Sequence, residues 1–79
     1  MEYYVYILKS LKDGSLYTGF TSNIQERLRS HNSGKVLSTR NKRPLKISYF
    51  EMCQNLEKAL AREKYLKSSK AKELKDSLR

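Results

Sequence analysis

The chain has too little cysteine and histidine for several structural and catalytic classes of protein. Its one cysteine, Cys53, cannot form an intramolecular disulfide, and its one histidine, His31, has no nearby cysteine with which to form a usual zinc site. A lone cysteine indicates a reducing compartment, so we expect a cytoplasmic protein. The composition excludes a disulfide-stabilised secreted scaffold and a zinc finger.

Long apolar runs are also missing. No stretch is long enough to span a bilayer, and the apolar segment from Tyr3 to Leu8 is too short for the core of a signal peptide. Basic segments that bind membrane surfaces usually present an apolar face rich in Trp, Phe or Leu. The lysine-rich residues 69–79 have only two leucines and one alanine and no aromatic residue. We therefore expect no membrane partner.

Acidic residues are scarce, and they are unevenly placed. Seventeen Lys and Arg residues stand against eight Asp and Glu residues, which gives a formal net charge of +9, and no acid lies between Glu26 and Glu51. A field of this sign favours anionic partners, so DNA is the predicted partner and RNA the alternative. The predicted phosphate-facing residues are Lys35, Arg40, Lys42, Arg43 and Lys46. A solvated surface that only improves solubility explains the same charges equally well.

The first third of the chain predicts a β-hairpin followed by a helix. Residues 3–10 and 15–20 are rich in aromatic and β-branched types, and the Asp13-Gly14 turn signal separates them. The first strand is apolar on both faces, which indicates the central strand of a sheet. A two-residue turn would pair Ser10 with Tyr17, and a longer loop would place Tyr6 opposite Tyr17. Both registers leave the two phenols on one face.

The helix after the hairpin carries two polar side chains beside its apolar stripe. Residues 21–23 supply an N-cap, and Ser22 with Gln25 fits a capping box. The helix is predicted to run to about His31, and Gly34 is its expected stop. Arg27 and His31 are one turn apart, so they lie on the same side of the helix. We expect residues 35–43 to be an exposed loop, because they are polar and basic without a usable period.

The second half of the chain predicts a strand and then helices. Residues 46–52 suit a strand that Pro44 precedes, residues 55–67 suit a helix, and residues 69–79 suit a short basic helix. The helix 55–67 is expected to bury Leu56, Ala59, Leu60 and Leu66. Glu63 falls on the same face, while Lys58, Arg62 and Lys64 are expected to point elsewhere. A carboxylate aimed at the body of a protein needs a partner, which we expect to be a metal ion, Arg27 or a lysine near the C-terminus.

Several of these positions together resemble the GIY-YIG nuclease family, in particular its small stand-alone bacterial members. The resemblance covers nearly the whole chain, which is predicted as one domain, residues 1–79. The matching positions are Tyr4-Val5-Tyr6, Tyr17-Thr18-Gly19, Asn23, Arg27, His31 and Glu63. The resemblance implies an α+β fold with a three-stranded antiparallel sheet flanked by helices. It also implies an endonuclease that hydrolyses DNA phosphodiester bonds with one metal ion.

Each residue role that the resemblance implies has a physical rationale and an ordinary alternative. Glu63 would bind Mg²⁺ or Mn²⁺, because these ions prefer oxygen ligands, and Arg27 would stabilise the growing phosphoryl charge. Tyr6 and Tyr17 are joint candidates for the base, with a slight preference for Tyr17, and His31 would orient water or contact a phosphate. The alternatives are a surface Arg27, a surface His31 and tyrosines that serve only the core.

Three departures from the family pattern are visible: the first motif reads Tyr4-Val5-Tyr6 instead of Gly-Ile-Tyr, and the other two leave other functions open. Phe20 follows the second motif where some members have Lys, and no Asn follows Asn55. The alternative to an enzyme is a non-catalytic nucleic-acid-binding module of the same fold. A third hypothesis is a protein-interaction domain that brings nuclease activity to a larger complex.

Overall fold

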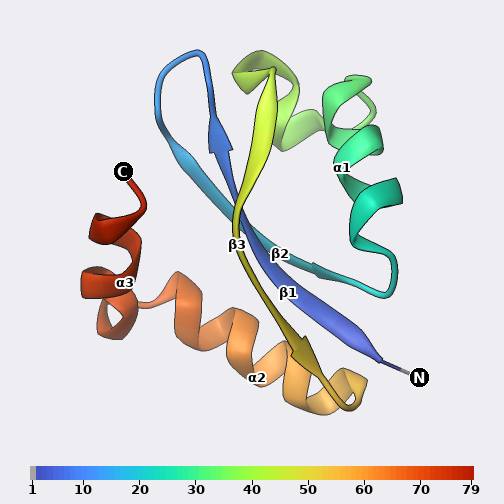
Figure 1. Ribbon diagram of the computed structural model, residues 1–79, viewed down its shortest axis with the longest axis vertical. Helices are drawn as coiled ribbons and strands as arrows, with labels where there is room; N and C mark the ends of the chain where they lie inside the picture. The colour runs from blue at the N-terminus through green and yellow to red at the C-terminus, as the bar shows by residue number, and fades with distance from the viewer. Residues whose placement is uncertain (1) are drawn as a thin grey trace.

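A three-stranded antiparallel sheet lies at the centre of the computed structural model, which describes residues 2–79 (Figure 1). Strand β1 (Tyr3–Ser10) lies between β2 (Leu16–Thr21) and β3 (Leu45–Cys53). Residues 5–8 are at most 1% exposed, so β1 is buried on both faces as its sequence predicts. The predicted α+β class with a three-stranded antiparallel sheet is confirmed.

The hairpin register places the two phenols on one face of the sheet. Tyr6 lies opposite Gly19 and Leu8 lies opposite Tyr17, so the two tyrosines are diagonal neighbours. The loop of residues 11–14 closes through a bond from the Ser10 amide to the Ser15 carbonyl, 2.8 Å. Both registers considered from the sequence are therefore wrong, but the predicted common face is confirmed.

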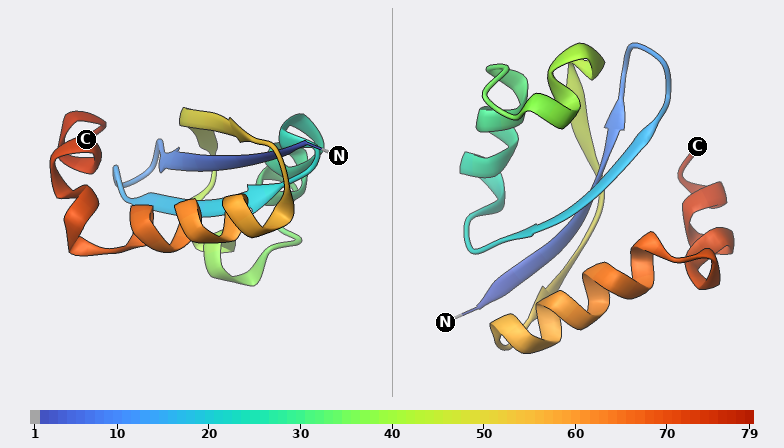
Figure 2. Two further views of the ribbon diagram at one scale, coloured as in Figure 1. Left: turned by 90° about the horizontal axis from the view of Figure 1, so that it is seen from below. Right: turned by 180° about the vertical axis from the view of Figure 1, so that it is seen from behind.

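Helices cover both faces of the sheet (Figure 2). Helix α1 (Ile24–Asn32) packs on the face that carries Tyr6 and Leu8. Helix α2 (Leu56–Lys67), the 3₁₀ turn η2 (Ser69–Ala71) and α3 (Lys72–Ser77) lie on the other side. The core under α2 and α3 consists of Val5, Cys53, Ala59, Leu66 and Ala71. No helix within residues 2–79 is long and apolar enough to cross a membrane.

The caps of α1 lie close to the predicted positions. The N-cap is Asn23, whose side chain accepts a bond from the Glu26 amide at 3.1 Å, so the predicted pair of Ser22 and Gln25 is wrong by one residue. At the other end, Gly34 has a φ of 85° and its amide donates to the His31 carbonyl. Only glycine adopts this conformation without strain, and the predicted stop is confirmed.

The segment 35–43 is not a plain loop. It contains the 3₁₀ helix η1 (Leu37–Lys42), and its Thr39 is only 1% exposed. The Ser10 hydroxyl donates to the Lys42 carbonyl at 2.7 Å, which ties η1 to the end of β1. Sequence periodicity misses η1 because a single buried residue in a short 3₁₀ segment gives no repeating pattern.

Helix α2 meets the sheet along a narrower line than its sequence suggests. Ala59 and Leu66 are fully buried, whereas Leu56 and Leu60 are 43% and 45% exposed, so their predicted burial is wrong. The small Ala59 side chain lets the helix backbone approach the sheet, which leaves the larger leucines on its flank. Arg62 was also expected to point away, but its guanidinium binds the Glu51 carboxylate of β3.

Candidate active site

The hydroxyl of Tyr6 is the centre of a buried polar cluster. Tyr6 is 1% exposed, and its ring reaches across Gly19 of the neighbouring strand. A Cβ atom added at Gly19 would lie 2.6 Å from the Tyr6 hydroxyl, so the missing side chain makes the space for the phenol. The Tyr6 oxygen lies 3.4 Å from Nε of Arg27 and 3.1 Å from Nε2 of His31.

Helix α1 supplies both partners of Tyr6 because Arg27 and His31 are one turn apart. His31 is fully buried, which excludes the surface-residue alternative. Its second ring nitrogen, Nδ1, lies 2.7 Å from the hydroxyl of Thr39. The ring of Tyr17 stands edge-on to the imidazole with 5.0 Å between ring centroids. The structure therefore brings together Tyr6, Tyr17, Arg27 and His31.

Burial and Arg27 determine the protonation states of this cluster. Burial raises the pKa of Tyr6 above its usual 10.0, and Arg27 opposes that rise. Burial, together with the positive charge of Arg27, lowers the pKa of His31 to about 4. The hydrogen bond to Tyr6 raises the pKa of Arg27, and Tyr17 adds to that rise. At neutral pH the cluster holds a protonated Tyr6, a neutral His31 and a charged Arg27.

Glu63 approaches the cluster from α2, which packs against β1 and β2. It shares the inward face of the helix with Ala59 and Leu66, and its side chain is only 19% exposed. Its negative charge is close enough to Tyr6 to be one of the smaller causes that raise the pKa of that phenol. Within residues 2–79 its ion-pair partner is Lys67 at 3.4 Å, rather than Arg27.

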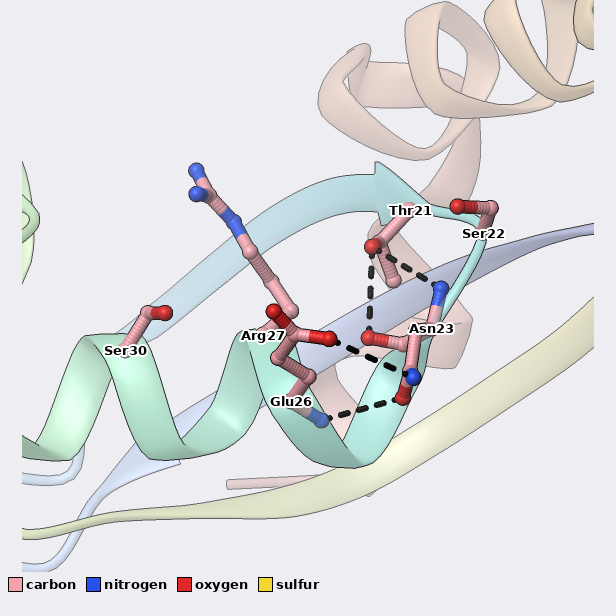
Figure 3. Close-up of a pocket in the computed structure, with 6 residues that line it drawn as sticks. All are labelled: Thr21, Ser22, Asn23, Glu26, Arg27 and Ser30. Atoms are coloured by element: carbon pink, nitrogen blue, oxygen red, sulfur yellow. Dashed lines mark hydrogen bonds between the residues drawn. The ribbon is translucent and has the colours of Figure 1, made fainter.

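A shallow groove of about 210 Å³ borders Arg27 on the outer side of the cluster (Figure 3). In Figure 3 the Arg27 side chain leaves α1 away from Asn23 and Glu26. Nε donates to Tyr6, and the two terminal nitrogens form the free end of the side chain. The groove is lined by Thr21, Ser22, Asn23, Glu26, Arg27 and Ser30. This arrangement leaves a cationic fork at the surface beside a buried phenol.

Three of the five predicted phosphate-facing residues gather around the end of α1. Lys35, Arg40 and Arg43 are exposed. Nε of Arg40 donates to the Gly34 carbonyl at 3.0 Å, and Nε of Arg43 donates to the Arg40 carbonyl at 2.9 Å. These bonds fix the base of each side chain, while the positive charges stay at the surface.

The other two predicted phosphate-facing residues lie elsewhere. Lys42 forms an ion pair with Asp13 of the hairpin loop at 2.6 Å and holds the pKa of that carboxyl well below its usual range. Lys46 lies opposite Lys9 on β1. Since side chains alternate along a strand, Lys46 faces away from the α1 side on which its neighbour Ile47 packs. The structure thus divides the predicted basic surface into separate parts.

A sequence model of the GIY-YIG catalytic domain matches residues 2–76. The chain belongs to the GIY-YIG family. Relatives include UPF0213 proteins of Clostridium perfringens, 49% identical over 81% of this chain and 69% of the relative, and of Syntrophus aciditrophicus, 46% identical over 90% and 84%. The solution NMR structure of a UPF0213 protein from Bacillus halodurans has a TM-score of 0.57 and 38% identity, and the match covers 100% of this chain and 86% of that one.

The two motif segments of this GIY-YIG domain lie side by side on β1 and β2, with Tyr6 opposite Gly19. Phe20, which departs from the pattern of some members, packs against the core under α2. It therefore serves the fold on the face opposite to Tyr6. Sequence reasoning missed Thr39, which contacts His31, because an isolated threonine in a polar segment carries no sequence signal.

The side chains of this GIY-YIG domain could bind a magnesium ion only through a single carboxylate. Within the described part of the chain, no group of three or more His, Cys, Asp or Glu side chains could hold a metal ion. Mg²⁺ keeps several waters and commonly uses one or two carboxylates with substrate phosphate oxygens. Glu63 suits that role, because its side chain is only 19% exposed, its charge acts on Tyr6 and its partner Lys67 is 54% exposed.

Proposed function

We propose that this GIY-YIG domain is a metal-dependent endonuclease that hydrolyses DNA phosphodiester bonds. The observation that carries the proposal is the position of the buried Tyr6 hydroxyl between Arg27 and His31, with the Glu63 charge nearby. A protein that only binds nucleic acid has no use for a largely buried carboxylate facing its anionic ligand. A buried phenol with a cation on one side and a neutral imidazole on the other is suited instead to proton transfer and to the stabilisation of charge during a reaction.

Arg27 is proposed to stabilise the negative charge that grows on the phosphoryl oxygens. A guanidinium stays protonated at every relevant pH and can donate two parallel bonds to phosphate. The bond from Nε to Tyr6 holds the side chain in place before the substrate arrives. A preorganised donor of this kind does not have to rearrange during the reaction, which is the usual source of electrostatic catalysis.

Glu63 is proposed to hold one Mg²⁺ or Mn²⁺ ion together with the substrate. When bound, the ion would polarise the phosphoryl group and make a coordinated water more acidic. Lys67, which is 54% exposed, would then release the carboxylate, because an ion pair between neighbouring turns of one helix contributes little. Glu63 would hold the ion, while Arg27 would bind the phosphate.

Tyr17 is proposed to take the proton from the attacking water. Tyr6 is less suited, because burial raises its pKa and its oxygen already contacts Arg27 and His31. Tyr17 is only half-buried, and it is near enough to Arg27 to raise the pKa of the guanidinium. Arg27 is thus placed to interact with a phenolate at Tyr17 and with the phosphate. The bond formed joins the water oxygen to phosphorus, and the bond broken joins phosphorus to the leaving deoxyribose oxygen, which takes a proton from solvent water and leaves as an alcohol.

The proposal is tested by incubating labelled duplex, single-stranded and branched DNAs with the protein in Mg²⁺, Mn²⁺ or EDTA. We expect cleavage of at least one DNA with a divalent ion and none in EDTA. In Arg27→Ala we expect the cleavage rate to fall far more than the DNA affinity. Binding without cleavage of any DNA under every condition would instead support the non-catalytic nucleic-acid-binding module.

A further inference from the structure

A continuous row of polar contacts leads from Arg27 into the interior of the protein. Nε of Arg27 lies 3.4 Å from the Tyr6 oxygen, which lies 3.1 Å from Nε2 of His31. Nδ1 of His31 lies 2.7 Å from the Thr39 hydroxyl, and that hydroxyl lies 3.5 Å from the Val36 carbonyl oxygen. Tyr6, His31 and Thr39 are each at most 1% exposed, so bulk water does not compete for these bonds.

The two ends of this row have fixed hydrogen-bonding roles. The Nε–H group of Arg27 can only donate, and the carbonyl of Val36 can only accept. If every member passes its hydrogen in the same direction, Tyr6 donates to Nε2, Nδ1–H donates to Thr39, and Thr39 donates to Val36. Every hydrogen in the row then has an acceptor.

The opposite tautomer of His31 leaves one of these hydrogens without an acceptor. With the proton on Nε2, the Tyr6 oxygen would accept from both His31 and Arg27, and Thr39 would donate to Nδ1. The hydroxyl hydrogen of Tyr6 would then have no acceptor within residues 2–79, because His31 and Arg27 are its hydrogen-bonding partners there. An unpaired buried donor is costly, so the first arrangement is favoured.

We propose that Thr39 is a positioning residue that holds His31 in the Nδ1–H tautomer, so that Nε2 accepts the Tyr6 hydrogen and the Tyr6 oxygen is directed toward Arg27. For its effect on DNA cleavage this inference rests on the proposed function, but the tautomer does not depend on that function. Burial and Arg27 keep His31 neutral, which the arrangement requires. Thr39 itself is held by η1, where its amide donates to the Val36 carbonyl at 3.2 Å.

The consequence for the site is that a residue on η1 orients the guanidinium on α1. Hydrogen bonds that run in one direction polarise one another in a buried environment, so each strengthens its neighbour. Without an acceptor at position 39, the Nε2–H tautomer is expected to become populated, and in that tautomer the Tyr6 hydroxyl would have to turn its hydrogen away from His31. The Arg27 side chain would then lose its fixed position next to Tyr6.

The tautomer can be measured directly, because His31 is the one histidine of the chain and gives one set of imidazole signals. Long-range ¹H–¹⁵N NMR correlations at pH 7 are expected to show the proton on Nδ1 in the wild type and in Thr39→Ser. In Thr39→Val, which keeps the shape and removes the hydroxyl, Nδ1–H loses its acceptor, so the preference for Nδ1 is expected to be lost and the Nε2–H tautomer is expected to become populated. A wild-type protein with the proton on Nε2 would overturn the proposal.

Removing the hydroxyl at the other end of the row distinguishes Thr39 from Tyr6 as the cause. In Tyr6→Phe the proton is expected to stay on Nδ1, because Thr39 is still present. A change of tautomer in Tyr6→Phe, with none in Thr39→Val, would show that Tyr6 controls the tautomer and would overturn the proposal. Backbone amide spectra check that each variant is folded, and Thr39→Ala, which also removes the hydroxyl, replaces Thr39→Val in the comparison with Tyr6→Phe if the valine variant unfolds.

Cleavage kinetics give an independent measurement if the domain cleaves DNA. Thr39→Val is expected to lower kcat about tenfold with little change in KM, and Thr39→Ser is expected to restore the rate. An unchanged kcat in a folded Thr39→Val with an altered tautomer would refute the link from Thr39 to Arg27. If the wild type cleaves no DNA, the proposed function fails, and the NMR result still decides whether Thr39 controls the tautomer.

Discussion

At the scale of single residues, the position of Tyr6 depends on its close contact with Gly19. Its missing side chain gives the Tyr6 ring room to cross β2 and reach both Arg27 and His31. The Tyr6 hydroxyl lies 3.1 Å from Nε2 of His31, whose own burial and the positive charge of Arg27 lower its pKa to about 4. A glycine on one strand therefore makes room for the phenol that contacts a histidine on a helix.

Gly19→Ala tests this contact. The added Cβ would lie 2.6 Å from the Tyr6 hydroxyl, so Tyr6 must move, and we expect a loss of about 1–3 kcal/mol in the free energy of unfolding in urea. The His31 ring signals should shift at the same time. Gly14→Ala is the control, because it is strained at a φ of 78° but has no atom within 4 Å of the new Cβ. Unchanged His31 signals in Gly19→Ala would contradict the contact.

The pKa of His31 predicts how stability depends on pH. Its pKa is about 4 in the folded protein and about 6.5 in the unfolded chain, so between these values the unfolded chain binds a proton that the folded protein does not. Stability must therefore fall as pH is lowered through this window, by about 2 kcal/mol between pH 7 and pH 5. NMR titration of His31 and urea unfolding at the two pH values measure this, and a midpoint near 6.5 would refute it.

At the scale of elements, the sequence predicts those features of the fold that depend on local residue patterns. The hairpin, the helix with Arg27 and His31, and the inward Glu63 follow from alternation and helical spacing. The outward position of Leu60 and the Glu51 partner of Arg62 could not be predicted, because they depend on how α2 crosses the sheet. Packing between a helix and a sheet that are distant in sequence produces no periodic pattern in the chain.

The η1 segment illustrates the same limit for the site. Composition predicts its exposed cations correctly, but neither the burial of Thr39 nor its contact with His31 can be predicted from composition. The predicted basic surface is also divided by register, because Lys46 faces the other side of the sheet from the α1 core. The number of basic residues in the sequence is therefore larger than the number that can contact one DNA backbone at the same time.

A matched pair of lysines tests which side of the sheet meets DNA. Lys35 and Lys46 are both exposed, but Lys35 follows α1 on the Arg27 side and Lys46 faces the opposite side. Lys35→Ala is expected to weaken DNA binding and to lower by about one the number of phosphate contacts, which is given by the slope of log affinity against log salt concentration. Lys46→Ala is expected to change neither quantity. The affinity of each variant for DNA, measured by fluorescence anisotropy at several salt concentrations, shows which side of the sheet binds DNA. A larger effect of Lys46→Ala would place DNA on the other face.

At the scale of the whole molecule, the site joins the two helical layers across the sheet. Residues 4–31 supply the phenols, the guanidinium and the imidazole from β1, β2 and α1, and they contain no carboxylate that reaches Tyr6. Glu63 comes from α2 on the other layer. The formal net charge of the chain is +9, which favours anionic partners. The fold thus brings Glu63, the proposed metal ligand, toward the cluster that holds Arg27, the proposed phosphate-binding residue, although the two are distant in sequence.

Glu63→Gln tests the central claim most directly, in a plasmid-nicking assay with Mg²⁺ and with EDTA. Glu57→Gln is the matched control, because Glu57 is exposed on the first turn of the same helix. The wild type and Glu57→Gln are expected to nick DNA only with Mg²⁺. Glu63→Gln is expected to lose nicking while DNA binding stays equal or becomes tighter, because a repulsive charge is removed. Equal Mg²⁺-dependent nicking by the wild type and purified Glu63→Gln would contradict the account.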